Sequence, residues 1–182
     1  MTETPAMMIS RHPAGTDHFS ESRFRGFTLV EMMVTIMVMA ILLGMAIPSL
    51  TDLMMRSKLT SYSTNLVASV QLARSEAIKR NAVVTLCASA DGATCASDWA
   101  AGWIVLSGTT VLQAQAGLPT GWRANETSGT GSLRFQPTGV GVTQAEFTFC
   151  RAIPTAGSQE RVVTLSATGS ASTKTTTAGV CS

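Results

Sequence analysis

Charged side chains are scarce in this sequence. Only 13% of its 182 residues are Asp, Glu, Lys or Arg, and the formal net charge is +2. Beyond residue 80 the charges cancel, so this part of the chain is neutral. The basic residues there are Arg123, Arg134, Arg151, Arg161 and Lys174, and the acidic ones are Asp91, Asp98, Glu126, Glu146 and Glu160. A generic basic surface for nucleic acid is therefore missing.

Histidine is rarer still. His12 and His18 both precede residue 26, and no two cysteines have the C-x-x-C spacing of a zinc site. Acid–base and nucleophilic chemistry usually needs a perturbed histidine, thiol or carboxylate pair in one pocket, and the carboxylates here are scattered. The glycine-rich stretches 129–131 and 139–141 lack the lysine of a phosphate loop and are predicted to be turns. We therefore predict no catalytic residue, no metal site and no cofactor.

The four cysteines all lie in the second half of the chain, at Cys87, Cys95, Cys150 and Cys181. An even number in an exported segment predicts two disulfides, for which three connectivities exist. We favour Cys87–Cys95, because the two are close in sequence. We pair Cys150 with Cys181, because that bond would tie down a polar C-terminal tail. Buried free thiols are the alternative.

A single apolar run dominates the first third of the chain. It extends from Phe27 to Ile47, and as a helix rising about 1.5 Å per residue it would span a bilayer core. The run is apolar except for Thr28, Glu31, Thr35 and Gly44. Arg23 and Arg25 precede the run, so they should keep its N-terminal side in the cytoplasm.

Gly26 is the obvious cleavage position near this run, and it lies before the run. An ordinary secretory signal is cut after its apolar region, which is then discarded. A cut after Gly26 would instead leave the apolar run on the mature protein. The run would then serve as an anchor or as a packing surface.

Glu31 places a carboxylate inside the apolar run, at a cost of several kcal/mol unless it finds a partner. Cleavage after Gly26 would create a partner, because the new α-amino group of Phe27 lies one helical turn away. The carboxylate could neutralise its own terminus or that of a neighbouring subunit. An acid tolerated near the membrane surface is the alternative.

The segment 26–31, Gly-Phe-Thr-Leu-Val-Glu, resembles the class III signal of type IV prepilins and type II secretion pseudopilins. The resemblance implies that a prepilin peptidase in the inner membrane cuts between Gly26 and Phe27 and methylates the Phe27 amine. It implies a role for Glu31 in assembly with other pilin or pseudopilin subunits. Pro48 lies where many pilins have a helix-bending proline.

After Pro48 the apolar residues recur at spacings of three and four, which predicts an amphipathic helix. These residues are Leu59, Tyr62, Leu66, Val70, Ala73 and Ala77. We expect one helix from Thr28 to Arg80, bent near Pro48. Its second half should pack on a β domain.

From Asn81 onward the chain has short apolar stretches separated by Gly, Pro and Ser, which predicts strands. The predicted strands cover residues 82–88, 102–106, 110–115, 132–136, 145–151 and 161–167, with a turn at 107–108. The polar stretch 168–179 is predicted to be a mobile loop unless a disulfide restrains it. Trp99, Trp103 and Trp122 are expected to pack in the core in preference to forming a ligand platform.

Four stretches resemble one subfamily, the FimT/FimU minor pilins and GspH pseudopilins: residues 72–81, 102–105, 147–150 and 179–181. The resemblance implies an α+β, type IV pilin-like fold, with a long N-terminal α-helix packed on a small antiparallel β domain. The cysteine pairs favour the pilus members. Some FimT-type proteins bind DNA through a Gly-Arg-x-Arg element near the C-terminus. The matching residues 169–172 are Gly-Ser-Ala-Ser, with only Lys174 nearby, so DNA is an unlikely partner.

We therefore predict four segments: a prepilin leader at residues 1–26, a transmembrane or filament-core helix at 27–50, an amphipathic helix at 51–80 and a β-rich globular domain at 81–182. The predicted function is a non-enzymatic minor pilin taking part in pilus assembly or a tip complex. It would cross the bacterial inner membrane once, with its C-terminal domain periplasmic, before entering a pilus or pseudopilus. The alternatives are a GspH-type pseudopilin of type II secretion and a DNA-binding minor pilin for transformation.

Overall fold

The computed structural model describes residues 26–139, 142–152 and 159–177, without the side chains of residues 46–49. It contains two units, which divide between Gly44 and Met45 and are described separately. One helix, α1 (Leu29–Arg80), provides residues to both. Its limits agree with the predicted helix to within one residue. The side chain of Pro48 is not among those described, so the bend predicted there stays a prediction.

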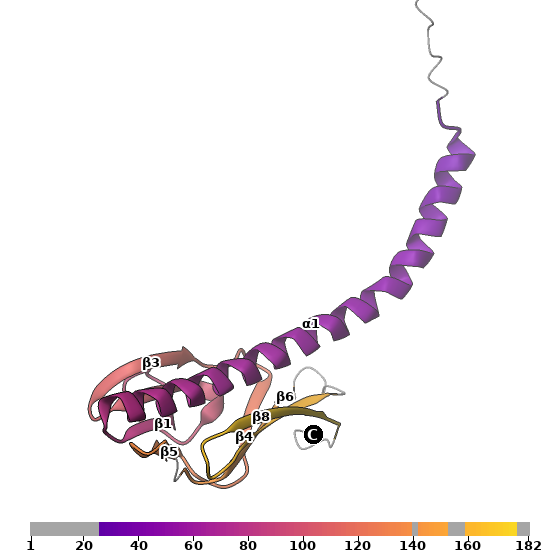
Figure 1. The fold of residues 1–182 in the computed structure, drawn as a ribbon. Helices are drawn as coiled ribbons and strands as arrows, with labels where there is room; N and C mark the ends of the chain where they lie inside the picture. The colour runs from indigo at the N-terminus through magenta and orange to yellow at the C-terminus, as the bar shows by residue number, and fades with distance from the viewer. Residues whose placement is uncertain (1–25, 140–141, 153–158, 178–182) are drawn as a thin grey trace, which may run out of the picture. The chain divides into compact units, whose positions relative to one another are not determined.

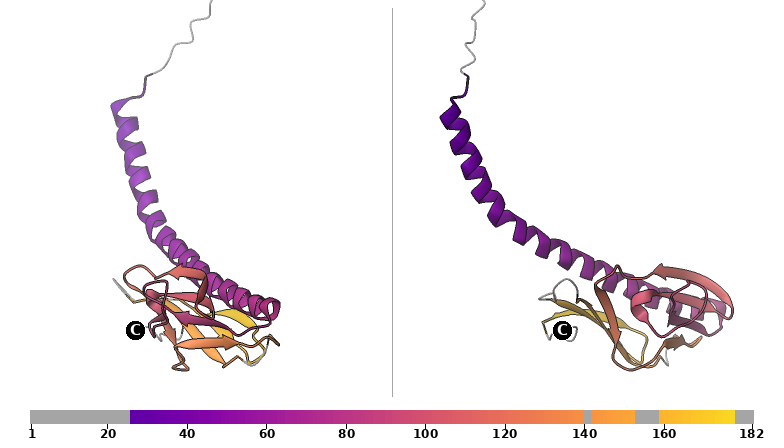
Figure 2. Two further views of the ribbon diagram at one scale, coloured as in Figure 1. Left: turned by 90° about the vertical axis from the view of Figure 1, so that its left-hand side faces the viewer. Right: turned by 180° about the vertical axis from the view of Figure 1, so that it is seen from behind.

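In the second unit, α1 buries one face. The buried apolar positions recur every three or four residues, as expected for a helix that rests lengthwise on a core. They are Met55, Leu59, Leu66, Val70, Ala73 and Ala77. Five of the six residues predicted from periodicity are thus buried, and Tyr62 is half-buried. Figures 1 and 2 show this part of α1 lying along the β domain.

The helix ends in a left-handed residue. Asn81 has φ 49°, and its N–H donates to the carbonyl of Ile78 at 3.3 Å. The N–H of Ala82 donates to the carbonyl of Ala77 at 3.2 Å. These two bonds form a Schellman motif, which satisfies carbonyls that the last turn would leave unpaired. Asparagine suits this position because its short side chain tolerates positive φ.

Eight strands form two antiparallel sheets in the described part of the chain. They are β1 (Val84–Ala88), β2 (Gly102–Ser107), β3 (Thr110–Ala116), β4 (Trp122–Glu126), β5 (Ser132–Phe135), β6 (Ala145–Arg151), β7 (Glu160–Leu165) and β8 (Ala171–Thr176). One sheet has the order β3-β2-β1-β5 and the other the order β4-β6-β7-β8. Both sheets contribute to one apolar core with α1. The fold is thus α+β, with a long N-terminal helix and an antiparallel β domain, as expected from the sequence.

Two strands were missed from the sequence. β4 was not predicted, and the loop expected at 168–179 in the absence of a restraining disulfide is wrong for Ala171–Thr176, which pairs with β7 along its whole length. The composition of β8, Ala-Ser-Thr-Lys-Thr-Thr, suggested a loop because it is polar. Threonine is nevertheless β-branched and fits an exposed edge strand well. The six predicted strands are all present, with limits shifted by at most two residues.

The tryptophans are mainly core residues. Trp99 and Trp103 are 3% and 2% exposed, and Trp99 packs edge-on against Phe147 at 4.7 Å between ring centroids. The Trp103 indole Nε1 donates to Ser69 Oγ of α1 at 3.0 Å. Trp122 is only half-buried and meets Tyr62 edge-on at 5.4 Å. The expectation of core packing is confirmed for Trp99 and Trp103.

A short disulfide loop follows β1. Cys87 and Cys95 are joined by a disulfide, and an isolated bridge pairs Ala88 with Ala96. Within the loop, Asp91 Oδ1 accepts from the N–H groups of Ala93 and Thr94 at 2.9 and 2.8 Å, while its Oδ2 accepts from Thr94 Oγ1. These hydrogen bonds hold the pKa of Asp91 well below its ordinary value. The loop is therefore fixed both covalently and by an ionised carboxylate.

Gly102 shows why β2 begins with glycine. Its φ is 121°, and a Cβ there would lie 2.6 Å from the carbonyl oxygen of Gln115 and 2.9 Å from that of Ser89. A side chain would therefore collide with backbone on two sides. This position brings β2 close to its neighbours and aligns Trp103, the next residue, with the core.

Candidate processing and assembly site

The residues on both sides of the predicted cleavage junction lie close together at the start of α1. Gly26, Phe27, Thr28 and Glu31 line one open surface pocket. Phe27 is 73% exposed, and a Cβ added to Gly26 would meet no atom within 4 Å. The chain on both sides of the 26–27 peptide bond is thus accessible to another protein.

Thr28 caps the helix. Its Oγ1 accepts from the N–H of Glu31 at 3.2 Å, and its carbonyl accepts from the N–H of Met32 at 3.2 Å. Threonine at the N-cap with glutamate three residues later is the residue pattern of a capping box. The carboxylate of Glu31 also lies in the first turn, where the helix dipole favours negative charge. Helix formation therefore fixes Glu31 one turn from the predicted new terminus at Phe27.

The apolar side chains that follow have nothing to pack on within their own unit. Every described residue from Leu29 to Met45 is exposed. An 18-residue window of α1 has a mean hydropathy of 2.3, is 0% buried and is long and apolar enough to cross a membrane. Such a surface requires lipid or another apolar partner.

Three of the four cysteines predicted to form disulfides lie in the described part of the chain. Cys87 and Cys95 are bonded to each other, as favoured from the sequence. Cys150 is also disulfide-bonded. Its expected partner, Cys181, lies outside the described residues, as does the 179–181 stretch that contributed to the family resemblance.

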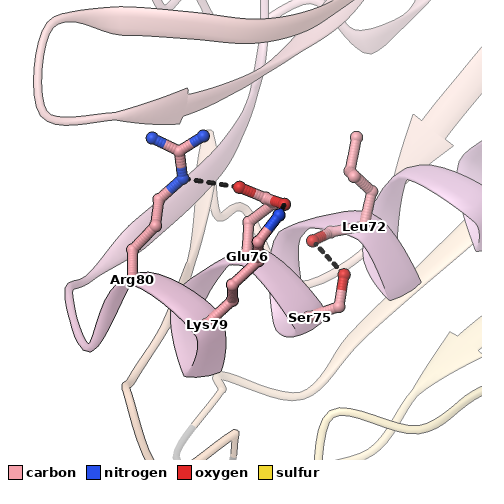
Figure 3. Close-up of polar contacts among 5 residues, drawn as sticks. All are labelled: Leu72, Ser75, Glu76, Lys79 and Arg80. Atoms are coloured by element: carbon pink, nitrogen blue, oxygen red, sulfur yellow. Dashed lines mark hydrogen bonds and ion pairs between the residues drawn. The ribbon is translucent and has the colours of Figure 1, made fainter.

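The 72–81 stretch forms the end of α1. Glu76 Oε2 accepts from Arg80 Nε at 2.5 Å, and its Oε1 lies 3.5 Å from Lys79 Nζ (Figure 3). Ser75 Oγ donates to the carbonyl of Leu72 at 2.9 Å. The hydrogen bond from Arg80 lowers the pKa of Glu76, and the Lys79 charge acts in the same direction. These are exposed contacts along one helix, so the stretch maintains the helix end and forms no reactive site.

The residues that match the DNA-binding element lie just before β8. Gly169 donates its N–H to the carbonyl of Ser166 at 2.9 Å, forming a turn. Ala171 and Ser172 begin β8, and Lys174 is exposed further along it. Arg74 of α1 also lies here, with its Nε 3.6 Å from the position of a Cβ on Gly169, so this corner of the described chain presents Arg74 and Lys174.

Comparison with protein families gives two matches. The prokaryotic N-terminal methylation motif matches residues 22–47, which include the junction and the first part of α1. The model described as type II transport protein GspH matches residues 63–169, more than half of the chain. The chain belongs to the GspH family. Minor pilins and pseudopilins share this family, and the N-terminal motif is the one expected from the sequence.

Solved structures support the GspH-family fold. The type IV minor pilin FimU of Pseudomonas aeruginosa is 26% identical, with a TM-score of 0.53, over 65% of this chain and 90% of that one. A second crystal form of FimU gives a TM-score of 0.51 over 64% and 92% of the two chains. The minor pseudopilin EpsH of Vibrio cholerae is 16% identical, with a TM-score of 0.47, over 66% and 98%. No curated protein sequence matches the chain significantly.

Sequence reasoning did not find the cap at Thr28 or the contacts that α1 makes with β4 and β7. The Thr-x-x-Glu spacing was available as a signal for the cap. The α1 contacts join residues about 60 to 100 positions apart, as in the 3.2 Å hydrogen bond from Arg161 Nη2 to Thr60 Oγ1. No local pattern in a single sequence encodes such a pair.

Proposed function

We propose that this GspH-family chain is a non-enzymatic minor pilin, cut between Gly26 and Phe27 and then assembled into a type IV pilus. The observation that carries the proposal is the exposed apolar helix that begins directly behind an accessible Gly-Phe junction. Residues 1–26 would be the leader, 27–50 the membrane and filament-core helix, 51–80 the amphipathic helix and 81–182 the globular domain. Before assembly the chain would cross the inner membrane once, with that domain in the periplasm.

Glu31 would direct assembly. An ionised carboxylate in an apolar helix bundle is costly unless it is paired, so subunit registers that leave Glu31 unpaired are penalised. The amine of Phe27, either its own or a neighbour's, is the partner that processing creates. Burial of the apolar helix supplies the attraction, and Glu31 selects the register.

Replacing Glu31 by Ala tests this role. We expect Glu31→Ala to insert in the membrane and to be processed normally, because the apolar run and the Gly26–Phe27 bond are intact. Its incorporation into sheared pili, measured by immunoblot, should fall by at least tenfold. Asp52→Ala removes an exposed acid from the same helix and serves as the control. Incorporation of Glu31→Ala at the wild-type level would refute the role.

The pilus is preferred over type II secretion for two reasons. FimU, a type IV minor pilin, is the more similar of the two kinds of solved relative, and disulfides favour the pilus members of the subfamily. A deletion strain scored together for pilus number, protein secretion and transformation would separate the alternatives. Loss of secretion with normal pili would instead assign the chain to a secretion pseudopilus.

DNA uptake is the weaker alternative. Residues 81–182 are neutral overall, and Lys174 and Arg74 beside residues 169–172 are too few for the phosphate contacts that give strong salt-dependent affinity. Duplex DNA titrated against the full chain in detergent tests it. A tight complex that weakens steeply with salt would revive this alternative, and no binding at low salt would remove it.

A further inference from the structure

Three cations from distant parts of the chain lie where the middle of α1 contacts β4 and β7. Arg56 and Lys58 are exposed on α1, and Arg161 lies on β7. Arg161 Nη2 donates to Thr60 Oγ1 of α1 at 3.2 Å, so the β7 cation is held against the helix. We call Arg56, Lys58 and Arg161 the cationic patch.

Two aromatic rings border the cationic patch. Lys58 Nζ lies 5.9 Å from the centroid of the Trp122 ring, within the range of a cation–π contact. Tyr62 packs edge-on against the same ring. Trp122 pairs across the sheet with Arg151, so a further cation shares this face of the sheet at its β4–β6 edge. Partly exposed tryptophan and tyrosine beside cations is the composition that proteins place at the surface of a membrane.

Acidic residues do not neutralise the cationic patch. Within the described residues, none of its three cations forms an ion pair with a carboxylate. Two acids lie near in sequence: Asp52 is exposed one turn earlier on α1, and Glu160 precedes Arg161 but is buried. Successive residues of a strand point to opposite faces, so Glu160 faces away from the helix side. The patch therefore presents a local excess of positive charge on a neutral domain.

The patch directly follows three exposed apolar residues of α1 in the second unit, among which lies the exposed Asp52. Leu50, Leu53 and Met54 are 53%, 62% and 57% exposed, and Arg56 follows two residues later. At about 1.5 Å per residue, Arg56 and Lys58 lie about 3 and 6 Å beyond Met54 along the helix axis. A lipid headgroup layer is about 5 to 8 Å thick on each side of the hydrocarbon core. Measured from Leu50, where the proposed membrane helix ends, Arg56 and Lys58 lie about 9 and 12 Å along the axis, and their long side chains would reach back to the headgroups at that surface.

We propose that the cationic patch, with Trp122, binds the phosphate groups of anionic phospholipids in the leaflet that faces the globular domain. Arg56 donates through Nη2 and Nε to the side-chain oxygen of Gln159 at 2.9 and 3.2 Å, so it and Arg161 would offer their remaining N–H groups to phosphate oxygens, and Lys58 would add a point charge. The proposal rests on the membrane-anchored state described under the proposed function, and it adds a lipid preference to that state. Duplex DNA fits less well, since the patch is short and adjoins exposed leucine and methionine.

Lipid selectivity of the full chain in vesicles tests the patch. The chain is reconstituted in phosphatidylcholine containing trace spin-labelled phosphatidylglycerol or spin-labelled phosphatidylcholine, and the motionally restricted fraction of each label is measured. We expect several-fold selectivity for the anionic label, weakened by salt. Each cation replaced by glutamine should reduce it by up to about fivefold, since a basic residue near an anionic surface contributes about 1 kcal/mol.

Matched variants keep the result interpretable. The triple variant Arg56→Gln, Lys58→Gln, Arg161→Gln should lose the selectivity, and Arg123→Gln, Arg134→Gln, Lys174→Gln should keep it at the same net charge. If loss of the Arg161–Thr60 bond impairs folding, the double variant that retains Arg161 gives the answer. Flotation with the vesicles reports insertion separately, so failure to insert counts against the membrane-anchored state alone. Three results would overturn the patch proposal. The first is equal restriction of both lipid labels by the inserted wild type, and the second is wild-type selectivity in the triple variant. The third is binding of added duplex DNA to the patch, with loss of the selectivity for the anionic label.

Discussion

The hydrogen bond from Trp103 to Ser69 links the sheet β3-β2-β1-β5 to α1 in the core. Both residues are buried, at 2% and 0% exposure, and Ser69 also donates to the carbonyl of Asn65 at 3.0 Å. The indole N–H therefore has its partner in a region from which water is excluded. A buried donor without a partner would cost the full desolvation penalty of that group.

We expect Ser69→Ala to destabilise the protein by about 1 to 3 kcal/mol, because it leaves the Trp103 N–H unpaired. Urea unfolding of the full chain in detergent, followed by tryptophan fluorescence, measures the change. Ser75→Ala is the matched control, since Ser75 is exposed and its hydroxyl bonds only within the helix. Equal stabilities for Ser69→Ala and the wild type would show that water or another group replaces Ser69.

The pH dependence of the disulfide loop follows from Asp91. Its folded pKa is depressed, so the stabilisation is complete above the ordinary Asp pKa of about 3.8 and declines as pH falls toward the folded pKa. The difference in unfolding free energy between wild type and Asp91→Asn should stay constant from pH 7 to about pH 5. It should shrink below about pH 4. Asp98→Asn, at the N-cap of the short helix Trp99–Ala101, is the comparison variant. If the difference in unfolding free energy between wild type and Asp91→Asn grew as pH fell, the stabilising role of the ionised Asp91 would be contradicted.

Single residues were predictable from the sequence where a local pattern specified them. The apolar stripe from Leu59 to Ala77 follows from spacing alone, because a helix places every third or fourth residue on one face. Ser69 could not be recognised as a core residue, since its role depends on Trp103, 34 positions away. The same holds for Arg161, whose partner Thr60 is 101 positions away.

At the scale of elements, α1 has two kinds of surface within one continuous helix. Residues 29–45 are exposed on all sides, whereas from Met55 onward one face is buried. The sequence signals this change, because the apolar run gives way to an amphipathic pattern after Pro48. Leu66 is fully buried and Leu53 is 62% exposed, although both are leucines on the same helix.

The two leucines should respond differently to the same change. We expect Leu66→Ala to destabilise the globular domain by about 2 to 5 kcal/mol through lost burial and the cavity left behind. Leu53→Ala should change the unfolding free energy by less than about 0.5 kcal/mol. Thermal unfolding of both full-length variants in the same detergent provides the comparison. A large loss of stability in Leu53→Ala would mean that this residue packs within the isolated subunit.

The strands show the limit of local patterns. Apolar strands such as β6 were predicted with both limits correct, whereas β4 and β8 were missed. β4 and β8 are the two opposite edge strands of one sheet, so each pairs with a single neighbouring strand. Their polar residues, including Arg123 and Lys174, are typical of edge strands that must not pair with other proteins. Edge position is a property of the assembled sheet, so composition alone left β4 unpredicted and suggested a loop for β8.

At the scale of the whole molecule, the predicted cleavage junction and the globular domain belong to different units. Gly26 and Phe27 are exposed, and the described β domain begins more than 50 residues later. The fold and the family could be predicted from sequence because the signal, the helix and the strand motifs agree. The filament system could not, because the N-terminal signal is common to pili and secretion systems.

Because Gly26 lies outside the unit that contains the β domain, a substitution there should affect processing and leave folding intact. We expect Gly26→Val to fold and insert normally, since the position has open space for a side chain, but to retain the leader. Intact mass of the membrane-extracted protein should then include residues 1–26. Gly44→Val introduces the same side chain at another open position of the apolar run and should be processed like the wild type. Efficient cleavage of Gly26→Val would place the junction elsewhere.

The lengthwise burial of α1 also has a mechanical consequence. The buried stripe from Met55 to Ala77 extends about 33 Å along the helix axis. Tension applied to the helix along this axis must slide all the buried side chains past the sheets at once, and it cannot detach them one turn at a time. The subunit should therefore resist axial pulling far better than pulling from the C-terminal end of α1, where turns could peel away in sequence.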